Sequence, residues 1–118
     1  MSAAAKSLFV FGLYLMALGV VLLFAPNMLL GAFGMPSTTE VWIRVVGMLV
    51  LLIGFLDVVA GRTELVPLFR ASVLARGLVP VVFAAFVIEG WAPVQLLLFG
   101  AVDLAGAVWT AVALRRAG

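Results

Sequence analysis

The sequence predicts an all-α integral membrane protein whose chain crosses the bilayer as four helices. Of its 118 residues, 67% are hydrophobic and 10% are charged, whereas a soluble domain is about half apolar and about a quarter charged. A soluble fold of this length has too little interior to bury so much apolar surface. Four apolar runs, each close to the roughly 20 residues that a helix needs to cross a bilayer, take up most of the chain. We therefore expect one domain, a polytopic four-helix bundle embedded in lipid.

The transmembrane spans are expected at about 7–25, 41–60, 68–89 and 94–114. The first run stops at Pro26, because proline cannot continue a helix. The apolar segment 29–34 is too short to cross, so we expect a short interfacial or re-entrant piece packed on the bundle. Lys6 before an apolar stretch also fits a signal peptide, but the run is long and no small-residue cleavage site follows it. We expect a retained span.

Basic residues are distributed unevenly between the two ends of the expected bundle. The residues that flank the spans on one side are Lys6, Arg62, Arg70, Arg115 and Arg116. The opposite loops, 27–39 and 90–93, contain no Lys or Arg. Because basic residues favour the cytoplasmic side, we expect both termini in the cytoplasm. Trp42 and Trp91 then fall at the outer boundary and Trp109 near the inner one, as in an aromatic belt.

Missing residue types exclude several classes of chemistry. The chain has no Cys and no His, which removes thiol catalysis, Cys-ligated iron–sulfur clusters and His-ligated haem, zinc or copper. Its one lysine, Lys6, precedes the first span, so no Schiff-base lysine lies in the membrane. The net charge of +2 is spread along the chain without a basic face, which argues against a nucleic-acid partner. We expect neither a cofactor nor a metal.

Three ionisable residues, Asp57, Arg76 and Asp103, lie inside the expected spans. A charge near the middle of a bilayer costs about 2.5–3.5 kcal/mol, so each must face the interior and find a partner. At a rise of about 1.5 Å per residue, they lie roughly 5, 12 and 16 Å above the inner edge, within the span of the long arginine side chain. We therefore expect a buried acid–base–acid cluster, with Arg76 in hydrogen-bonding reach of Asp103, Asp57 or both. Tyr14, at mid-depth of the first span, adds a hydroxyl group that needs a partner.

Helical periodicity also gathers small and polar residues on common faces. These stripes are Arg44, Gly47, Gly54, Asp57 and Gly61 on the second span, Ser72, Arg76 and Pro80 on the third, and Gln95, Asp103, Gly106 and Thr110 on the fourth. The first span contributes Gly12, Gly19 and Tyr14. Small residues let membrane helices approach closely, and polar ones bond across the contact. We expect the stripes to converge on one interior.

Four segments resemble pieces of small four-span bacterial inner-membrane proteins, broadly DoxX-like in size and layout. They are FAPNMLLGAFGMP (24–36), WIRVVGMLVLLIGFLDVVAGR (42–62), LFRASVLARGLV (68–79) and DLAGAVWT (103–110). The resemblance implies a helical bundle in the bacterial cytoplasmic membrane. It brings no activity and no catalytic residue.

The charged cluster favours a protein that binds, or acts on, an apolar molecule such as a terpenoid, a sterol-like or a quinone-like compound. In an enzyme, Asp103 would be the proton donor or base, Asp57 its counterpart, Arg76 the organiser and Tyr14 a hydrogen-bond donor. Two carboxylates beside an arginine can divide such labour, because one is held ionised and the other, poorly solvated, can carry a proton. The activity would be that of a cofactor-independent isomerase, cyclase or epoxide-opening hydrolase.

Two other classes of function stay open on the sequence. The chain could be an accessory or scaffold subunit that holds membrane lipids, a second copy of itself or a partner in a membrane complex. It could also be a small oligomeric proton-coupled transporter, with Asp103 and Arg76 as its gating charges. In addition, charges buried in a membrane bundle can serve only to hold helices in register, so a purely structural cluster is a further alternative.

Overall fold

A computed structural model of the protein describes residues 1–117. These residues form the helices α1 (Ala3–Phe24), α2 (Pro26–Ala32), α3 (Trp42–Arg62), α4 (Val66–Ile88) and α5 (Leu96–Ala117). All but α2 are long and apolar enough to cross a membrane. The prediction of an all-α protein with four long apolar helices, each a candidate membrane span, is therefore confirmed.

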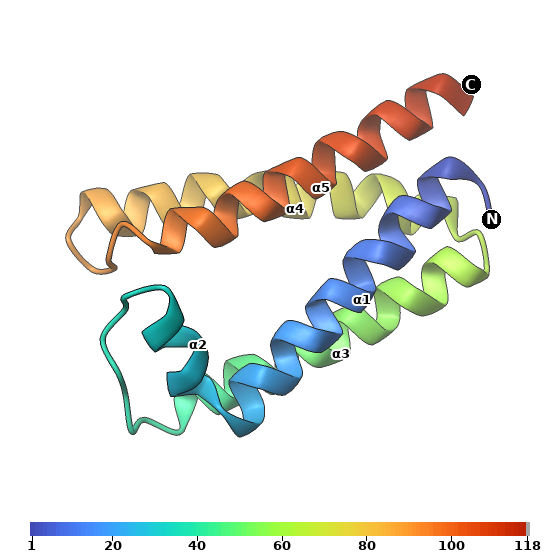
Figure 1. Cartoon of the computed structure of the whole chain (residues 1–118). Coiled ribbons are helices and arrows are strands. Elements are labelled where there is room, and N and C mark those ends of the chain that lie inside the picture. Colours follow the sequence, from blue (N-terminus) through green and yellow to red (C-terminus); the bar gives the residue numbers. More distant parts are fainter. Residues whose placement is uncertain (118) are drawn as a thin grey trace.

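The four long helices are arranged as two pairs that meet at one end and diverge toward the other (Figure 1). Helix α1 packs along α3, and α4 packs along α5. Contact between the pairs runs mainly through α1 and α5, whereas α3 and α4 make little contact. Both termini lie at the end where the pairs meet, and α2 lies at the open end (Figure 1).

The closed end is held by a compact core to which all four long helices contribute. Its buried members are Ala4, Ala5 and Leu8 of α1, Ala60 of α3, Phe69 of α4 and Ala113 of α5. Phe69 is fully buried and is the largest side chain in this core. Small residues around one large aromatic let four helices converge here. No such core joins the two pairs at the open end of the described residues.

Backbone contact between α1 and α3 comes from small residues spaced seven apart on each helix. Ala5, Gly12 and Gly19 of α1 face Gly61, Gly54 and Gly47 of α3. A Cβ atom added to any of these glycines would come within 2.9 Å of a backbone atom of the other helix. The glycines of the second span therefore pack against those of the first, a close approach that small residues predict, and Asp57 of the same stripe lines a cavity with Arg76 and Asp103.

Helix boundaries differ from the sequence-based ones by a few residues, for local reasons. Helix α1 begins at Ala3 rather than near residue 7, because the Ser2 hydroxyl accepts a hydrogen bond from the Ala5 backbone N–H at 3.1 Å. Helix α1 ends at Phe24, and Pro26 is the first residue of α2. Proline is favourable there, because the backbone N–H that it lacks would have no partner within the helix. Helix α2 is the short piece expected near 29–34, and Leu30 buries it against the rest of the protein.

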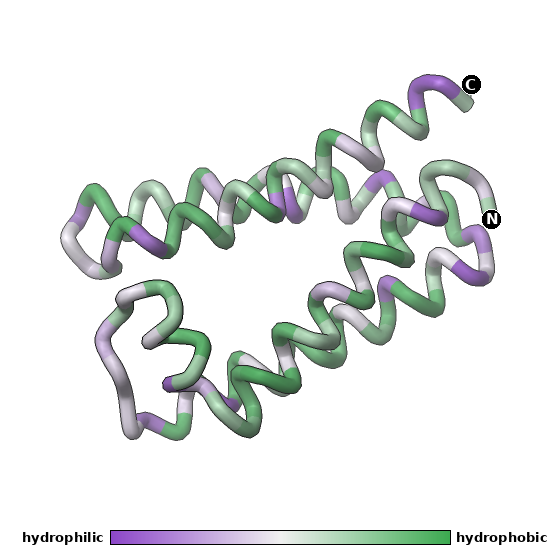
Figure 2. Tube along the Cα trace, in the orientation of Figure 1, coloured by the Kyte–Doolittle hydropathy of each residue, from purple (hydrophilic) through white to green (hydrophobic). Residues whose placement is uncertain are grey.

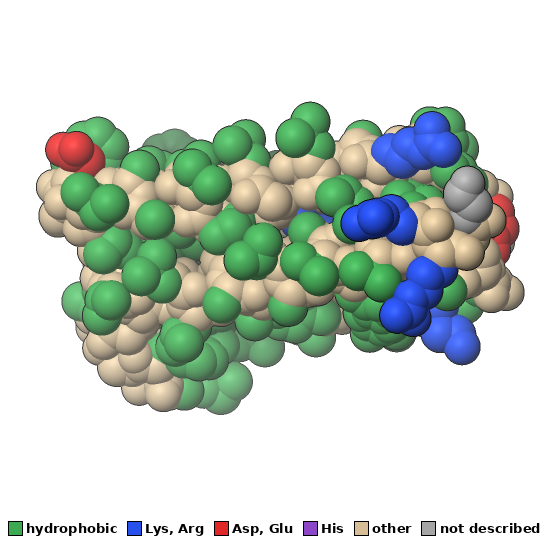
Figure 3. Space-filling model, turned by 90° about the horizontal axis from the view of Figure 1, so that it is seen from above, with side chains coloured by type: hydrophobic (Ala, Val, Ile, Leu, Met, Phe, Trp, Pro, Cys, Tyr) green, Lys and Arg blue, Asp and Glu red, His purple; other side chains and the backbone are tan. Residues whose placement is uncertain are grey.

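The outside of the helices is apolar, as a lipid-facing surface requires. Leu74, Val81 and Ile88 of α4 are 78%, 64% and 82% exposed. Hydrophobic residues continue along nearly the full length of the long helices (Figure 2). Most Lys and Arg side chains visible in Figure 3 gather at the end that carries the termini. The chain thus has the surface of a small multi-pass membrane protein.

Hydrogen bonds tie down the connections at both ends. At the closed end, the Glu64 carboxylate accepts hydrogen bonds from the Ser2 backbone N–H and, at 2.8 Å, from the Ser2 hydroxyl. At the open end, Arg44 donates to the Leu23 carbonyl oxygen at 2.6 Å, near the last turn of α1. These bonds link α1 to α3, or to the loop that follows it, at either end.

Candidate functional site

The Arg76 guanidinium is buried where α4 meets α1 and α5. It is 6% exposed, and its Nη2 donates to the hydroxyl groups of Ser72 and Thr110, each at 2.8 Å. Its Nε donates to the Ser72 carbonyl oxygen at 3.3 Å. Thr110 is also bonded to the Ser7 hydroxyl at 2.6 Å, and Ser7 donates to the Ala4 carbonyl oxygen at 2.7 Å. A chain of hydroxyl groups from three helices therefore holds the guanidinium in place.

The remaining nitrogen of this guanidinium, Nη1, is buried without a hydrogen-bond partner among the described residues. The Phe11 ring lies beneath the group, with its centroid 4.7 Å from Cζ of Arg76. Such a cation–π contact offsets part of the cost of desolvating the charge. Gly106 lies beside both groups, since a Cβ atom there would stand 2.9 Å from Nη1 of Arg76 and 2.7 Å from Cδ2 of Phe11. The charge therefore lies close to both α1 and α5.

The expected direct pairing of Arg76 with a carboxylate was wrong. Its hydrogen bonds within residues 1–117 all go to Ser72 and Thr110. Ser72 lies one turn away on the same helix, and Thr110 is the residue of α5 that packs beside Arg76. Asp103 lies seven residues before Thr110, about 10 Å along the same helix, and Asp57 lies on α3, which makes little contact with α4. Asp57, Arg76 and Asp103 instead share the walls of one cavity of about 440 Å³ between the helix pairs.

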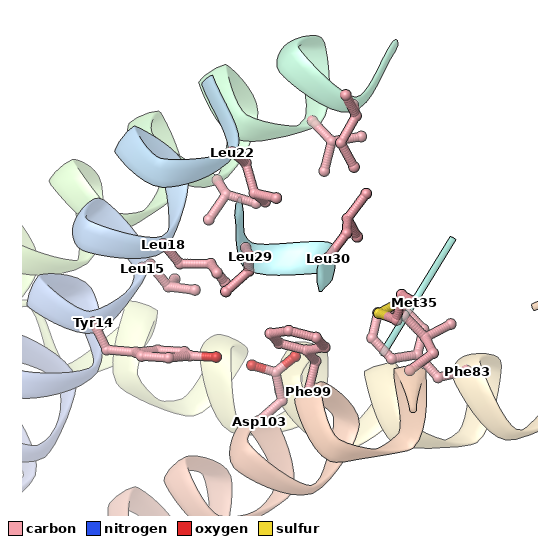
Figure 4. Close-up of a pocket in the computed structure, with 14 residues that line it drawn as sticks. Tyr14, Leu15, Leu18, Leu22, Leu29, Leu30, Met35, Phe83, Phe99 and Asp103 are labelled. Carbon is pink, nitrogen blue, oxygen red and sulfur yellow. The ribbon is translucent and has the colours of Figure 1, made fainter. Parts of the chain in front are cut away.

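A second cavity, of about 210 Å³, continues toward the open end. Leucines of α1 and α2 form much of its wall, together with Met35 and Phe99 (Figure 4). The residues shared by the two cavities are Leu15, Val50, Phe83 and Asp103. The cavities thus adjoin, and Asp103 stands at their junction.

Tyr14 of α1 and Asp103 of α5 lie on opposite walls of the smaller cavity. Figure 4 shows the tyrosine hydroxyl and the carboxylate directed toward one another across it. None of the side-chain hydrogen bonds in residues 1–117 involves Tyr14, Asp103 or Asp57. The Asp57 side chain is nevertheless buried, with 7% of its surface exposed. The walls of both cavities therefore carry polar groups that the described part of the protein leaves unpaired.

The structure brings together all four residues proposed from the sequence, around two adjoining cavities rather than in one bonded cluster. Groups of three or more His, Cys, Asp or Glu side chains that could hold a metal are not found in the described residues. Two carboxylates and a phenol hydroxyl can accept, donate or exchange protons with a bound molecule. Arg76, on the wall of the larger cavity, supplies a fixed positive charge.

Sequence reasoning missed the partners that hold Arg76. Ser7 and Phe11, four residues apart on one face of α1, were not singled out, although that spacing points both side chains the same way. Ser72 and Thr110 were placed on the stripes of Arg76 and Asp103 but not assigned as its partners. The i, i+4 spacing of Ser72 and Arg76 is the signal that could have identified the first of these bonds.

Fold and site together define a small four-span membrane protein with polar groups on the walls of an internal apolar cavity. Comparison of the chain with protein-family models, with curated proteins and with solved structures gives no match. Function must therefore be inferred from the cavity and its residues.

Proposed function

We propose that this protein binds an elongated, lipid-like apolar molecule in the two adjoining cavities between its helix pairs. The observation that carries the proposal is the set of unpaired polar groups on these walls, namely Tyr14, Asp57 and Asp103. At about 1.5 Å per residue, Tyr14 lies about 16 Å and Asp103 about 21 Å from the end of the helix near the termini, well inside the membrane. Polar groups at such depth need partners, because the hydrocarbon core offers no water.

The shape of the cavities supports an occupant with a long apolar part. Small-molecule sites are mostly apolar cavities of about 300–1,000 Å³ with a few well-placed polar groups. The larger cavity has about 440 Å³ and the smaller one about 210 Å³, and they share four wall residues. Residues of both α3 and α4 line the larger cavity, and these two helices make little contact with each other.

The membrane we assign is the bacterial cytoplasmic membrane, with both termini in the cytoplasm. Support comes from the basic residues at the end that carries the termini (Figure 3) and from the resemblance of four segments to DoxX-like proteins of that membrane. Membrane lipids are the natural source of the occupant, because both cavities lie between helices that cross the bilayer.

A second candidate function is acid–base chemistry on the bound molecule. Asp103 at the junction and Asp57 in the larger cavity face the same space from α5 and α3. In an isomerisation, one carboxylate would take a proton from the substrate while the other, protonated, gave one back, so that no net proton is consumed. Arg76 would hold the developing negative charge, and Tyr14 would orient the substrate.

Photolabelling in lipid nanodiscs tests whether the cavity binds such a molecule. The probe is farnesol carrying a diazirine, and the labelled positions are mapped by mass spectrometry. Val50 lines both cavities, so Val50→Trp should block labelling there. Leu74→Trp is the matched control, since Leu74 is 78% exposed on the lipid-facing surface. If wild-type protein is labelled only on its outer surface, or if Val50→Trp is labelled like the control, the cavity is not a binding site.

A further inference from the structure

The smaller cavity presents a hydrogen-bond donor on one wall and an acceptor on the other. We propose that the bound molecule is an alcohol, whose hydroxyl group is held between Tyr14 and Asp103 while its apolar part extends toward α2. This inference rests on the proposed function, because it names the chemical class of the molecule in the same cavity. Figure 4 shows the two side chains converging from α1 and α5.

Hydrogen-bond chemistry selects the head group. A phenol hydroxyl can donate or accept, an ionised carboxylate accepts only, and a protonated one also donates. An alcohol hydroxyl accepts from Tyr14 and donates to Asp103 at the same time. It also satisfies Asp103 in either protonation state, since it can reverse its role. Both groups, unpaired within residues 1–117, are then satisfied by one atom of the occupant.

Other head groups fit these two residues less well. The carbonyl of a ketone, aldehyde or quinone only accepts, so it bonds Tyr14 and leaves an ionised Asp103 unpaired. A carboxylate would place a second negative charge beside Asp103. An ammonium group only donates, so it would leave the hydrogen of the Tyr14 hydroxyl without an acceptor. Each of these pairings leaves a polar group without a hydrogen-bond partner, or places like charges next to each other, in a medium of low polarity.

The rest of the wall determines the remainder of the molecule. Beyond Tyr14 and Asp103, the smaller cavity is lined by Leu18 and Leu22 of α1 and by Leu29 and Leu30 of α2 (Figure 4). These side chains offer no polar atom. The occupant is therefore a long-chain or ring-containing alcohol with a single polar end, such as an isoprenoid or sterol-type alcohol.

A series of molecules with one chain and different head groups tests this inference. Farnesol, farnesal, farnesoic acid and farnesene compete with the diazirine-farnesol probe for the full-length protein in nanodiscs. Farnesol should compete about tenfold better than farnesal or farnesene, the factor expected for one buried hydrogen bond. The advantage over farnesal depends on donation to Asp103, so it should disappear in Asp103→Leu, which has no acceptor. The advantage over farnesene should fall in Tyr14→Phe, which loses the phenol hydroxyl. Both advantages should persist in Glu89→Gln, where the altered carboxyl is exposed at the far end of α4.

The possible outcomes separate the inference from the function on which it rests. Equal competition by all four compounds, or a preference for the alcohol over the aldehyde that survives in Asp103→Leu, overturns the inference and leaves binding intact. Cavity labelling that none of the compounds prevents overturns the proposed function as well. If either variant fails to fold, the ranking of head groups on the wild-type protein still decides whether the alcohol is preferred.

Discussion

The carbonyl oxygen of Gly54 lies 2.7 Å from the position that a Cβ atom on Gly12 would occupy, so α1 and α3 touch through their backbones. The same closeness recurs at the pair Gly19 and Gly47. This contact holds α3 against α1 along its whole length and keeps it from leaning toward α4. The helix pair fixed in this way supplies one wall of both cavities.

Replacing Gly12 or Gly54 by alanine should therefore force α1 and α3 apart. Either methyl group would meet backbone atoms of the other helix within 3.0 Å, which cannot be relieved by moving a side chain. We expect a loss of about 1–3 kcal/mol, typical of overpacking, in unfolding experiments in mild detergent. Gly77→Ala is the control, because a Cβ atom there meets nothing within 4 Å. Equal stability of Gly12→Ala and Gly77→Ala would contradict the close packing.

Thr110 should be essential for holding Arg76, because its hydroxyl links the guanidinium to Ser7. Thr110→Val keeps the shape and removes the hydroxyl, leaving Nη2 of Arg76 with one partner fewer. We expect a loss of about 1–3 kcal/mol, the cost of an unsatisfied buried group. Thr110→Ser retains the hydroxyl and should recover most of the stability in the same thermal unfolding assay. Failure of serine to recover more than valine would show that packing, rather than hydrogen bonding, is what Thr110 provides.

Arg76 and Asp103 should respond differently to neutral substitutions. Asp103→Asn breaks no hydrogen bond within the described residues, so we expect stability to change by less than about 0.5 kcal/mol. Arg76→Lys keeps the charge but loses the planar fork that reaches Ser72 and Thr110 together, and should be clearly destabilised. Chemical unfolding in detergent measures both. An Asp103→Asn protein as unstable as Arg76→Lys would indicate a direct ion pair.

The number and rough position of the helices could be predicted because a bilayer demands about 20 apolar residues per span. Which helix faces pair could not be predicted. Glycines spaced seven residues apart on α1 and α3 indicate that each helix has a close neighbour, but they do not identify which helix that neighbour is. The same limit applies to Arg76. Its depth in the membrane suggested carboxylate partners, whereas the rotation of α5 against α4 brought Thr110 to it instead. Depth follows from sequence position, but rotation follows from packing.

Glu64 should make the N-terminal turn of α1 sensitive to acid. Hydrogen bonds from the Ser2 backbone N–H, and then from the Ser2 hydroxyl, lower the pKa of this carboxyl below its ordinary value of 4.5. Because this pKa is lower in the folded state, the contact stabilises the folded protein at pH values above the ordinary pKa. The stabilisation is lost as the pH falls through the pKa of the folded state. Amide hydrogen exchange in Ala3–Lys6 should therefore accelerate below about pH 4.5, beyond the normal pH dependence of exchange. Glu64→Gln should lack this acid step, and its presence there would assign it to another group.

The orientation of the bundle can be tested with single cysteines, because the natural chain has none. Ser37 lies in the connection after α2 at the open end, and Thr63 follows α3 at the end that carries the termini. Both residues are exposed, so a membrane-impermeant maleimide can reach either one from its own side. With basic residues concentrated near Thr63, the positive-inside rule places that end in the cytoplasm. In intact cells, Ser37→Cys should be labelled and Thr63→Cys should be labelled only after the membrane is permeabilised. The reverse labelling pattern would show the opposite orientation, with the termini outside and the open end of the bundle on the cytoplasmic side.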